Sequence, residues 1–339
     1  MYRIILFFLA TLVLMPFRSV MAQDPEFSQF YAAPMNLNPA LAGVAWGPRF
    51  NTTYRNQWPG LEKGFVTYAV GYDQYFEKAR SGFGVFIMND RTAAGLINNY
   101  TIKLNYAFRF QLGKKVGVQV GLSGGYIRKQ VDWARLTFND QINPIFGFSD
   151  SNGSANLSGE QVPNSLAVNI ADFGTGLVAY SKNLFGGIAL QHITSPKESI
   201  TQYTDYKLPM KITVHAGGQI NLTPKKRNSE NFLSPNAMFI TQGTASQLNI
   251  GTYANFGKVF GGVFYRNNFS NSDAVIGLIG LKIYFVKLGY SYDYTISTLQ
   301  GYTGGAHEIS LSINLGDKDG PFDHTRKPNR LECPGVLNF

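Results

Sequence analysis

The sequence of 339 residues contains a single cysteine, Cys333, which excludes an internal disulfide bond. It has only four histidines. Neither they nor the cysteine are spaced like metal ligands or a catalytic set, so we expect no enzyme activity, metal site or cofactor. The formal charge is +9, but Lys and Arg are scattered, with no cluster longer than Lys225–Arg227. This distribution argues against a nucleic-acid-binding protein.

Long apolar runs are also absent after Ala22, which excludes a membrane-spanning helix in the rest of the chain. Before that point one cation, Arg3, precedes the apolar run Ile4–Met15, and Val20 and Ala22 occupy the −3 and −1 positions of a cleavage site. Residues 1–22 therefore have the pattern of a cleavable signal peptide. The alternative is a membrane anchor, but the apolar core of about 12 residues falls short of the roughly 20 that span a bilayer.

The remaining sequence is rich in period-2 alternation. From Tyr100 to Leu112 an apolar residue, often aromatic, takes every second position, and mostly polar residues lie between. This pattern predicts a β-strand with one apolar and one polar face. The stretch is much longer than the roughly 5–6 residues usual for a soluble strand. Long alternating strands behind an export signal are typical of an outer-membrane β-barrel.

Fourteen segments of this kind are predicted, an even number, as expected of a single-chain bacterial barrel. They are 48–58, 64–76, 82–90, 98–112, 115–129, 172–182, 184–194, 209–222, 231–242, 245–256, 258–268, 273–285, 286–294 and 305–316. A soluble β-sandwich also alternates, but rarely with so many long strands. We therefore predict an all-β fold, a 14-stranded antiparallel transmembrane β-barrel over 48–316, located in the outer membrane.

The connections between the predicted strands give an independent test. If the chain enters from the periplasm, links after odd-numbered strands face outward and should be longer. Most are, and the longest is 130–171. The 243–244 link is short and the 223–230 link long for this rule, which leaves an error in the strand count open.

With the apolar face outward, the polar face of the strands lines the barrel lumen. Six basic residues are predicted there: Arg49, Arg55, Lys103, Arg109, Lys211 and His215. Two interpretations stay open. The lumen receives an acidic segment or a plug, or its charges brace the wall as ion pairs, for example Arg109 with Asp73 or Asp293. Gly117, Gly121 and Gly125 on the inner face leave room for an occupant.

Residues 23–47 depart from the barrel pattern. Asp24-Pro25 and Asn38-Pro39 each place a capping residue before proline, which predicts short helices. The segment also carries five large apolar side chains: Phe27, Phe30, Tyr31, Leu37 and Leu41. Because burial of each is worth roughly 1.5–3 kcal/mol, we expect the segment to pack as a plug in the periplasmic mouth, near Arg49 and Arg55, or to form a periplasmic docking segment.

Two further segments are candidates for partner binding. The long outward link carries four aromatic residues in a Gly/Asn/Ser-rich sequence: Trp133, Phe138, Phe146 and Phe148. We interpret it as the main surface for a protein cargo. Residues 317–339 lack a strand pattern and are expected to form a periplasmic tail beside the N-terminal segment, or to be disordered.

Several motifs resemble those of one known family. The chain is similar to the opening of the PorP/SprF family in DPEFSQFY (24–31), NPALAG (38–43) and YRNQWP (54–59), and it also matches in SGFGV (81–85) and Cys333-Pro334. The resemblance covers the chain that follows the predicted signal peptide. It implies an outer-membrane component of the type IX secretion system of Bacteroidota, with other subunits of that system as partners.

Members of this family assist the export or surface retention of proteins that carry a C-terminal sorting domain, and some handle a gliding adhesin. The resemblance therefore implies a non-enzymatic, protein-handling barrel in contact with outer-membrane lipid. An N-terminal plug with an Asn-Pro-Ala run, as at Asn38–Ala40, also resembles the FadL-like transporters of hydrophobic small molecules. Such a transporter is the alternative.

Overall fold

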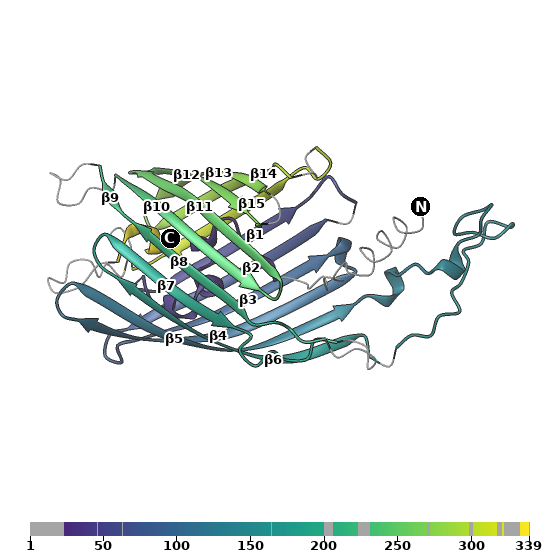
Figure 1. The fold of residues 1–339 in the computed structure, drawn as a ribbon, viewed down its shortest axis with the longest axis horizontal. Coiled ribbons are helices and arrows are strands. Elements are labelled where there is room, and N and C mark those ends of the chain that lie inside the picture. The colour runs from purple at the N-terminus through teal and green to yellow at the C-terminus, as the bar shows by residue number, and fades with distance from the viewer. Residues whose placement is uncertain are drawn as a thin grey trace, which may run out of the picture.

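The computed structural model describes residues 24–45, 47–62, 64–163, 165–199, 206–222, 231–269, 272–297, 301–316, 321 and 333–338. The predicted signal peptide lies outside the described residues, as does most of the predicted tail. The long elements of the described chain are strands that form one antiparallel sheet (Figure 1). No helix in the described ranges is long and apolar enough to cross a membrane.

The strands follow one another around a closed barrel, and the pairing of β10 with β11 completes the ring. They are β1 (Arg49–Gln57), β2 (Phe65–Phe76), β3 (Ser81–Thr92), β4 (Ile97–Leu112), β5 (Val116–Val131), β6 (Ala167–Tyr180), β7 (Leu184–Gln191), β8 (Lys211–Gly218), β9 (Ile220–Asn221), β10 (Phe232–Gln242), β11 (Ala245–Phe256), β12 (Val259–Asn267), β13 (Ser272–Ile283), β14 (Val286–Thr295) and β15 (Ala306–Asn314). Both β8 and β9 pair with β10, so together they form one strand of a 14-stranded wall.

The predicted fold class is confirmed, and every predicted strand has a counterpart within a few residues. The largest difference is at β6, which begins at Ala167 rather than at residue 172. Its outward positions there are Asn169 and Ala171, so the apolar pattern of a lipid-facing strand is missing. The short 243–244 link does not mark an error in the strand count, because β10 and β11 pair in continuous register up to that turn.

The two ends of the barrel differ in their connections. One end, the short-turn end, carries tight turns such as 77–80, 113–115 and 284–285. The other, the long-loop end, carries the β5–β6 connection, which extends well beyond the barrel (Figure 1). Since outer-membrane barrels have short periplasmic turns and longer external loops, we assign the long-loop end to the cell exterior.

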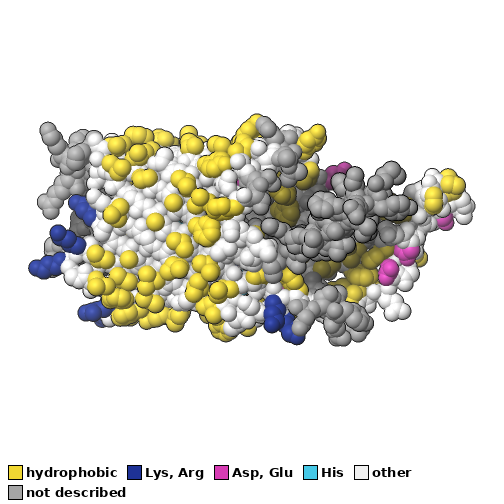
Figure 2. All heavy atoms as spheres, viewed as in Figure 1, with side chains coloured by type: hydrophobic (Ala, Val, Ile, Leu, Met, Phe, Trp, Pro, Cys, Tyr) yellow, Lys and Arg dark blue, Asp and Glu magenta, His cyan; other side chains and the backbone are white. Residues whose placement is uncertain are grey.

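The outer and inner faces of the wall alternate as predicted. On β4, Tyr100, Ile102 and Leu104 are exposed, whereas Lys103 and Arg109 are buried. Apolar side chains are spread over the visible barrel wall, and most of the visible Lys and Arg lie at the left end, with a further patch at the lower edge of the wall (Figure 2). The exposed cations of the short turns are Lys78, Arg80, Lys114, Lys115, Lys182 and Lys258.

Candidate functional site

The N-terminal segment fills the lumen. Its short helices are η1 (Phe30–Ala32), α2 (Pro34–Leu37) and η2 (Pro39–Leu41). All five predicted apolar side chains are buried, none of them more than 5% exposed: Phe27, Phe30, Tyr31, Leu37 and Leu41. The segment therefore packs inside the barrel.

The segment runs the length of the lumen and is not confined to one mouth. The Asp24 N–H donates to Gln242, the last residue of β10 at the long-loop end (3.0 Å). The Gly43 N–H donates to Asp73 (2.7 Å), which pairs in register with Arg49 at the start of β1 and the short-turn end. The predicted placement in the periplasmic mouth is thus wrong in extent, because Arg49 and Arg55 lie at different depths of the lumen.

Of the two predicted helix-capping residues, Asn38 caps a helix and Asp24 does not. The Asn38 side chain caps η2 by accepting a hydrogen bond from the Ala40 N–H at 2.9 Å. Asp24 does not cap a helix, since residues 24–27 are not helical and its carboxylate contacts the ring of His192 instead.

Aromatic rings anchor the middle of the segment. The Phe30 ring lies 5.6 Å from that of Phe264, and the Tyr31 ring lies 5.7 Å from that of Phe185, both edge-on. Tyr253 contacts both Phe30 and Tyr31. Edge-on pairs of this kind add about 0.5–1.5 kcal/mol each beyond their buried area. These contacts join the segment to β7, β11 and β12.

Glycines in the wall let the segment approach the strands closely. A Cβ added at Gly121 would collide with the backbone of Ala40, and one at Gly176 would collide with the side chain of Asn38. The other wall glycines that face the segment are Gly71, Gly82, Gly84 and Gly289. These contacts come from several strands around the barrel, so the segment fits the lumen as packed protein.

The glycine prediction is correct for Gly121 only. Gly117 lies against the ring of Tyr180, and Gly125 lies against Lys103. Their room is taken by neighbouring wall side chains, which periodicity does not reveal because they belong to the adjacent strands β6 and β4.

Buried ion pairs hold the outer half of the segment. Arg55 contacts the carboxylates of Asp293 (2.9 Å) and Glu308 (3.1 Å), and Arg266 also contacts Asp293 (2.9 Å). The Glu308 carboxylate accepts the backbone N–H groups of Ser28 (2.8 Å) and Gln29 (2.9 Å). The network therefore has both predicted roles of the lumenal charges: it forms ion pairs between wall strands and it binds the N-terminal segment.

At the short-turn end Arg49 pairs with Asp73 at 2.9 Å, and both side chains are fully buried. Arg109 makes different contacts: it donates to the Gly43 carbonyl at 2.9 Å and lies over the ring of Tyr75 at 4.2 Å. The predicted pairing of Arg109 with Asp73 or Asp293 is therefore wrong, since other arginines occupy those carboxylates.

A second charged cluster lies at the long-loop end around His192. Its ring nitrogens contact Asp24 (2.6 Å) and Asp172 (2.8 Å). Lys103 lies 3.6 Å from Asp172, and Lys211 pairs with Glu26. The predicted lumenal residues Lys103 and Lys211 thus hold the beginning of the segment.

The charges of this cluster shift the pKa values of His192 and Asp24, which both lie outside the strands. Burial by itself lowers the pKa of His192, but Asp24 and Asp172 outweigh it, so the pKa lies above its usual value. Burial by itself raises the pKa of Asp24, but His192 and Lys211 bring it well below its usual range. Each group therefore favours the charged form of the other, as expected of a buried ion pair.

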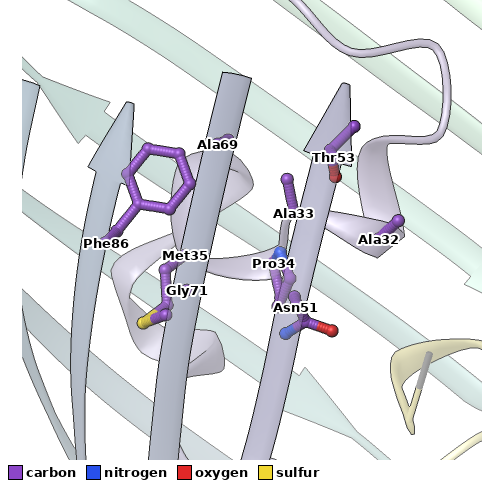
Figure 3. Close-up of a pocket in the computed structure, with 9 residues that line it drawn as sticks. All are labelled: Ala32, Ala33, Pro34, Met35, Asn51, Thr53, Ala69, Gly71 and Phe86. Atoms are coloured by element: carbon purple, nitrogen blue, oxygen red, sulfur yellow. The ribbon is translucent and has the colours of Figure 1, made fainter. Parts of the chain in front are cut away.

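His215, the last of the predicted lumenal residues, contacts the segment through one nitrogen, 3.2 Å from the Asn38 amide. A small cavity remains on the opposite side, between Ala32–Met35 and strands β1 to β3 (Figure 3). Asn51 lines it, and neither amide atom of this buried side chain has a hydrogen-bond partner in the described chain.

The described part of the tail also contacts the segment. Cys333 is buried beside the Val44 carbonyl, and the carbonyl of Leu337 accepts a hydrogen bond of 3.1 Å from Arg49. The Gly335 N–H donates to Gln219 at 2.7 Å, at the break between β8 and β9. These residues add to the packing at the short-turn end.

The predicted cargo-binding aromatics divide into two pairs. Trp133 and Phe138 are partly buried against each other, with ring centroids 5.0 Å apart. Phe146 and Phe148 are 50% and 54% exposed. Ile145 is 83% exposed and Leu157 is 90% exposed on the same β5–β6 connection, so the exposed apolar surface extends beyond the predicted aromatic residues.

The structure adds residues that the sequence analysis did not select. The main ones are Asp24, Glu26, Ser28, Gln29, Asp172, His192, Arg266 and Glu308. Two of the acids, Asp172 and Glu308, could have been found from the alternation of inward and outward residues, because they lie on the inward positions of their strands. Ser28 and Gln29 lie in the motif DPEFSQFY (24–31), but no charge or alternation pattern marks them as contacts of the wall.

Comparisons with solved structures found several chains with a similar fold. A TodX deltaS2S3 mutant, titled a monoaromatic hydrocarbon channel, is 11% identical with a TM-score of 0.49, over 83% of this chain and 93% of that one. The Ralstonia pickettii toluene transporter TbuX is 13% identical with a TM-score of 0.43, over 82% and 90%. Acinetobacter baumannii Omp33 is 10% identical with a TM-score of 0.40, over 79% and 97%. Because the sequence identities and TM-scores are this low, the similarity does not indicate a function.

A comparison with curated proteins found no match. The model of one protein family, described as type IX secretion system membrane protein PorP/SprF, matches residues 19–313. The match covers nearly the whole barrel and the segment within it, and it agrees with the motif resemblance. The chain therefore belongs to the PorP/SprF family of type IX secretion system membrane proteins.

Proposed function

We propose that this outer-membrane barrel serves the type IX secretion system through its surfaces and not through its lumen. It assists the secretion or surface retention of proteins with a C-terminal sorting domain, gliding adhesins among them. One observation carries the proposal: the N-terminal segment occupies the lumen from Asp24 to Val44 and is fixed there by Arg55, Glu308 and Arg49. A filled lumen leaves the two ends as the surfaces for partners.

The β5–β6 connection is the candidate cargo surface. Phe146, Phe148, Ile145 and Leu157 are exposed on it, and exposed apolar clusters of this kind mark protein-binding sites. At the opposite end, the exposed lysines of the short turns form a basic rim that suits acidic secretion-system subunits or the membrane surface.

The alternative, transport of hydrophobic small molecules, receives less support. Such a function needs a passage beside the segment, and the wall at Gly121 and Gly176 is already in contact with it. Transport would require the segment to leave its buried ion pairs during each passage.

The test is cargo retention in a strain that lacks the chromosomal copy. Complementation with the full chain should restore sorting-domain proteins to the cell surface. Complementation with a chain whose residues 145–160 are replaced by a Gly/Ser linker should not, although the barrel still migrates as a folded species on unboiled gels. Normal retention without the chromosomal copy would overturn the function, whereas normal retention with the linker variant alone would place the cargo surface elsewhere.

Affinity purification of the detergent-extracted barrel gives a second readout. Secretion-system subunits should co-purify with both the full chain and the linker variant, because the short-turn end is unchanged. Their absence from both preparations would contradict the proposal.

A further inference from the structure

The barrel wall is incomplete along the outer half of β6. This strand extends over Ala167–Tyr180, but it pairs with β7 only from Thr175 onward. Along the rest, β6 has β5 on one side. On the other side, within the described chain, a single backbone hydrogen bond reaches it, from the Ile193 N–H to the Phe173 carbonyl.

The register shows which backbone groups face the open side. In an antiparallel pair, alternate residues direct both their N–H and their C=O toward one neighbour. The Val131 N–H donates to the Leu166 carbonyl, so the even-numbered residues of β6 bond to β5. The N–H and C=O groups of Asn169 and Ala171 therefore face away from β5, and no hydrogen bond joins them to another described residue.

The opening has a local cause at the end of β7. His192 has a positive φ of 55°, which turns the chain away from β6. Its ring is held inside by Asp24 and Asp172, and the following hairpin packs over the inner face of the wall, where Leu208 joins Ile170 and Ile127. The chain that would have continued as a neighbour of β6 covers the lumen instead.

The open edge lies at the outer surface of the membrane. Ala171 pairs in register with Tyr126, and Asn169 pairs with Arg128. The side chains of Tyr126 and Arg128 point outward and are exposed. Tyrosine is typical of the membrane interface, and an exposed arginine excludes the hydrocarbon core. Unpaired backbone groups are tolerated at this level because water reaches them.

We propose that the edge of β6 at Asn169–Ala171 binds an extended segment of an exported polypeptide, which adds to the sheet as a further strand. The edge ends at Ala167, whose N–H and carbonyl already bond to the Ser165 hydroxyl. Open edges of this kind recruit strands through backbone hydrogen bonds. The small side chains of Ala167 and Ala171 leave room beside the edge, and exposed Arg128 favours an acidic residue on the incoming strand. This inference rests on the proposed function for the source of the segment.

A second copy of the chain does not fit this edge. Two barrels in one membrane share the same orientation, and their β6 strands are tilted from the membrane normal. A two-fold axis along the normal would make the two strands cross and prevents a hydrogen-bonded ladder. A strand from a different protein has no such restriction.

Amide hydrogen exchange of the full-length barrel in lipid nanodiscs tests the edge directly. Without a partner, the amides of Asn169 and Ala171 should exchange at least ten times faster than those of Ile170 and Asp172, which bond to β5. The probe is the purified C-terminal sorting domain of a type IX cargo, and its addition should slow the two fast amides at least tenfold. Slow exchange at both positions without the probe would overturn the open edge.

The Ala171→Pro variant removes an N–H that faces the open side and leaves the β5 ladder intact. It should bind the sorting domain at least tenfold more weakly, with an unchanged unboiled gel mobility that confirms folding. Asn169→Ala is the matched control, because it changes the side chain and keeps the backbone, and it should bind normally. Equal binding by both variants and the unmodified chain would overturn the docking edge alone. Failure of the unmodified chain to bind the probe would count against the proposed function.

Discussion

Arg55 on β1 donates a hydrogen bond of 2.8 Å to the hydroxyl of Ser28 in the N-terminal segment. The same hydroxyl donates to Asp293 at 2.6 Å, and the Ser28 N–H donates to Glu308. Arg266 also donates to this hydroxyl at 3.2 Å, so the segment enters the hydrogen-bond network of the wall at one residue that contacts four charged side chains. Removal of the segment leaves these charges without several of their buried partners.

The Arg55→Met variant should lower the free energy of unfolding by about 3–5 kcal/mol, because it removes the cation that pairs with buried Glu308 and one of the two that pair with buried Asp293. Urea titration of the barrel in detergent, followed by gel mobility, measures the change. Arg135→Met is the matched control, since Arg135 forms a half-exposed pair with Asp132 and should contribute about 0–1 kcal/mol. Equal effects of the two substitutions would contradict the structural role of the network.

A methyl group at Gly121 should displace the segment. The Gly121→Ala variant places a Cβ against the Ala40 backbone, and overpacking of this kind costs about 1–3 kcal/mol. The midpoint temperature at which the folded band disappears from unboiled gels should fall. Gly124→Ala on the same strand is the control, because its Cβ would meet only the Phe173 ring at 4.0 Å.

Deletion of residues 24–42 should open an aqueous path. A 14-stranded barrel is wider than the eight-stranded kind that wall side chains alone can fill. In planar bilayers the full chain should be electrically silent and the deletion variant should conduct ions. A closed deletion variant would show that the segment is not what seals the lumen, and loss of co-purifying secretion subunits from it would favour a docking role.

The outer end of the segment should loosen at alkaline pH. The raised pKa of His192 stabilises the folded state fully below its ordinary value of 6.5, and this contribution is lost as pH rises through the raised value. The lowered pKa of Asp24 has the opposite pH dependence. Its contribution to the stability of the folded state is fully present above pH 3.8 and is lost only in strong acid. Near this pair, Asp172, Lys103, Lys211 and Glu26 are the other charged groups.

Amide exchange measures this effect. Corrected for intrinsic rates, the amides of residues 26–28 should be better protected at pH 6 than at pH 9. The His192→Gln variant should lose that difference while the amides of η1 stay protected in both proteins. The same pH dependence in the variant would assign the effect to another group.

The barrel was predictable because lipid imposes one rule on every strand. Where the outward residue faces lipid, as at Ile102 or Leu104, alternation fixes both the strand and its face. The rule stops at the membrane surface, so the start of β6 at Ala167 was missed. The inward direction of Arg49 and Arg55 follows from the same parity, and both are buried.

The partners of these inward charges were not predictable. The alternation of the strand places Arg109 in the lumen. It does not show that Arg49 forms the ion pair with Asp73, because pairing depends on strand register and tilt. The five apolar residues of the segment signalled burial, but their depth depends on His192 and Glu308, which are far away in sequence. The signal peptide and the cargo-binding role of Phe146 and Phe148 stay predictions.

The direction of the N-terminal segment sets an order of events in assembly. Asp24 lies at the long-loop end, whereas β1 begins at the short-turn end, so the chain crosses the whole lumen before the first strand starts. Contacts as close as those at Gly121 and Gly176 leave no clearance for a polypeptide to slide through a finished ring. We therefore expect the strands to close around a segment that is already in place.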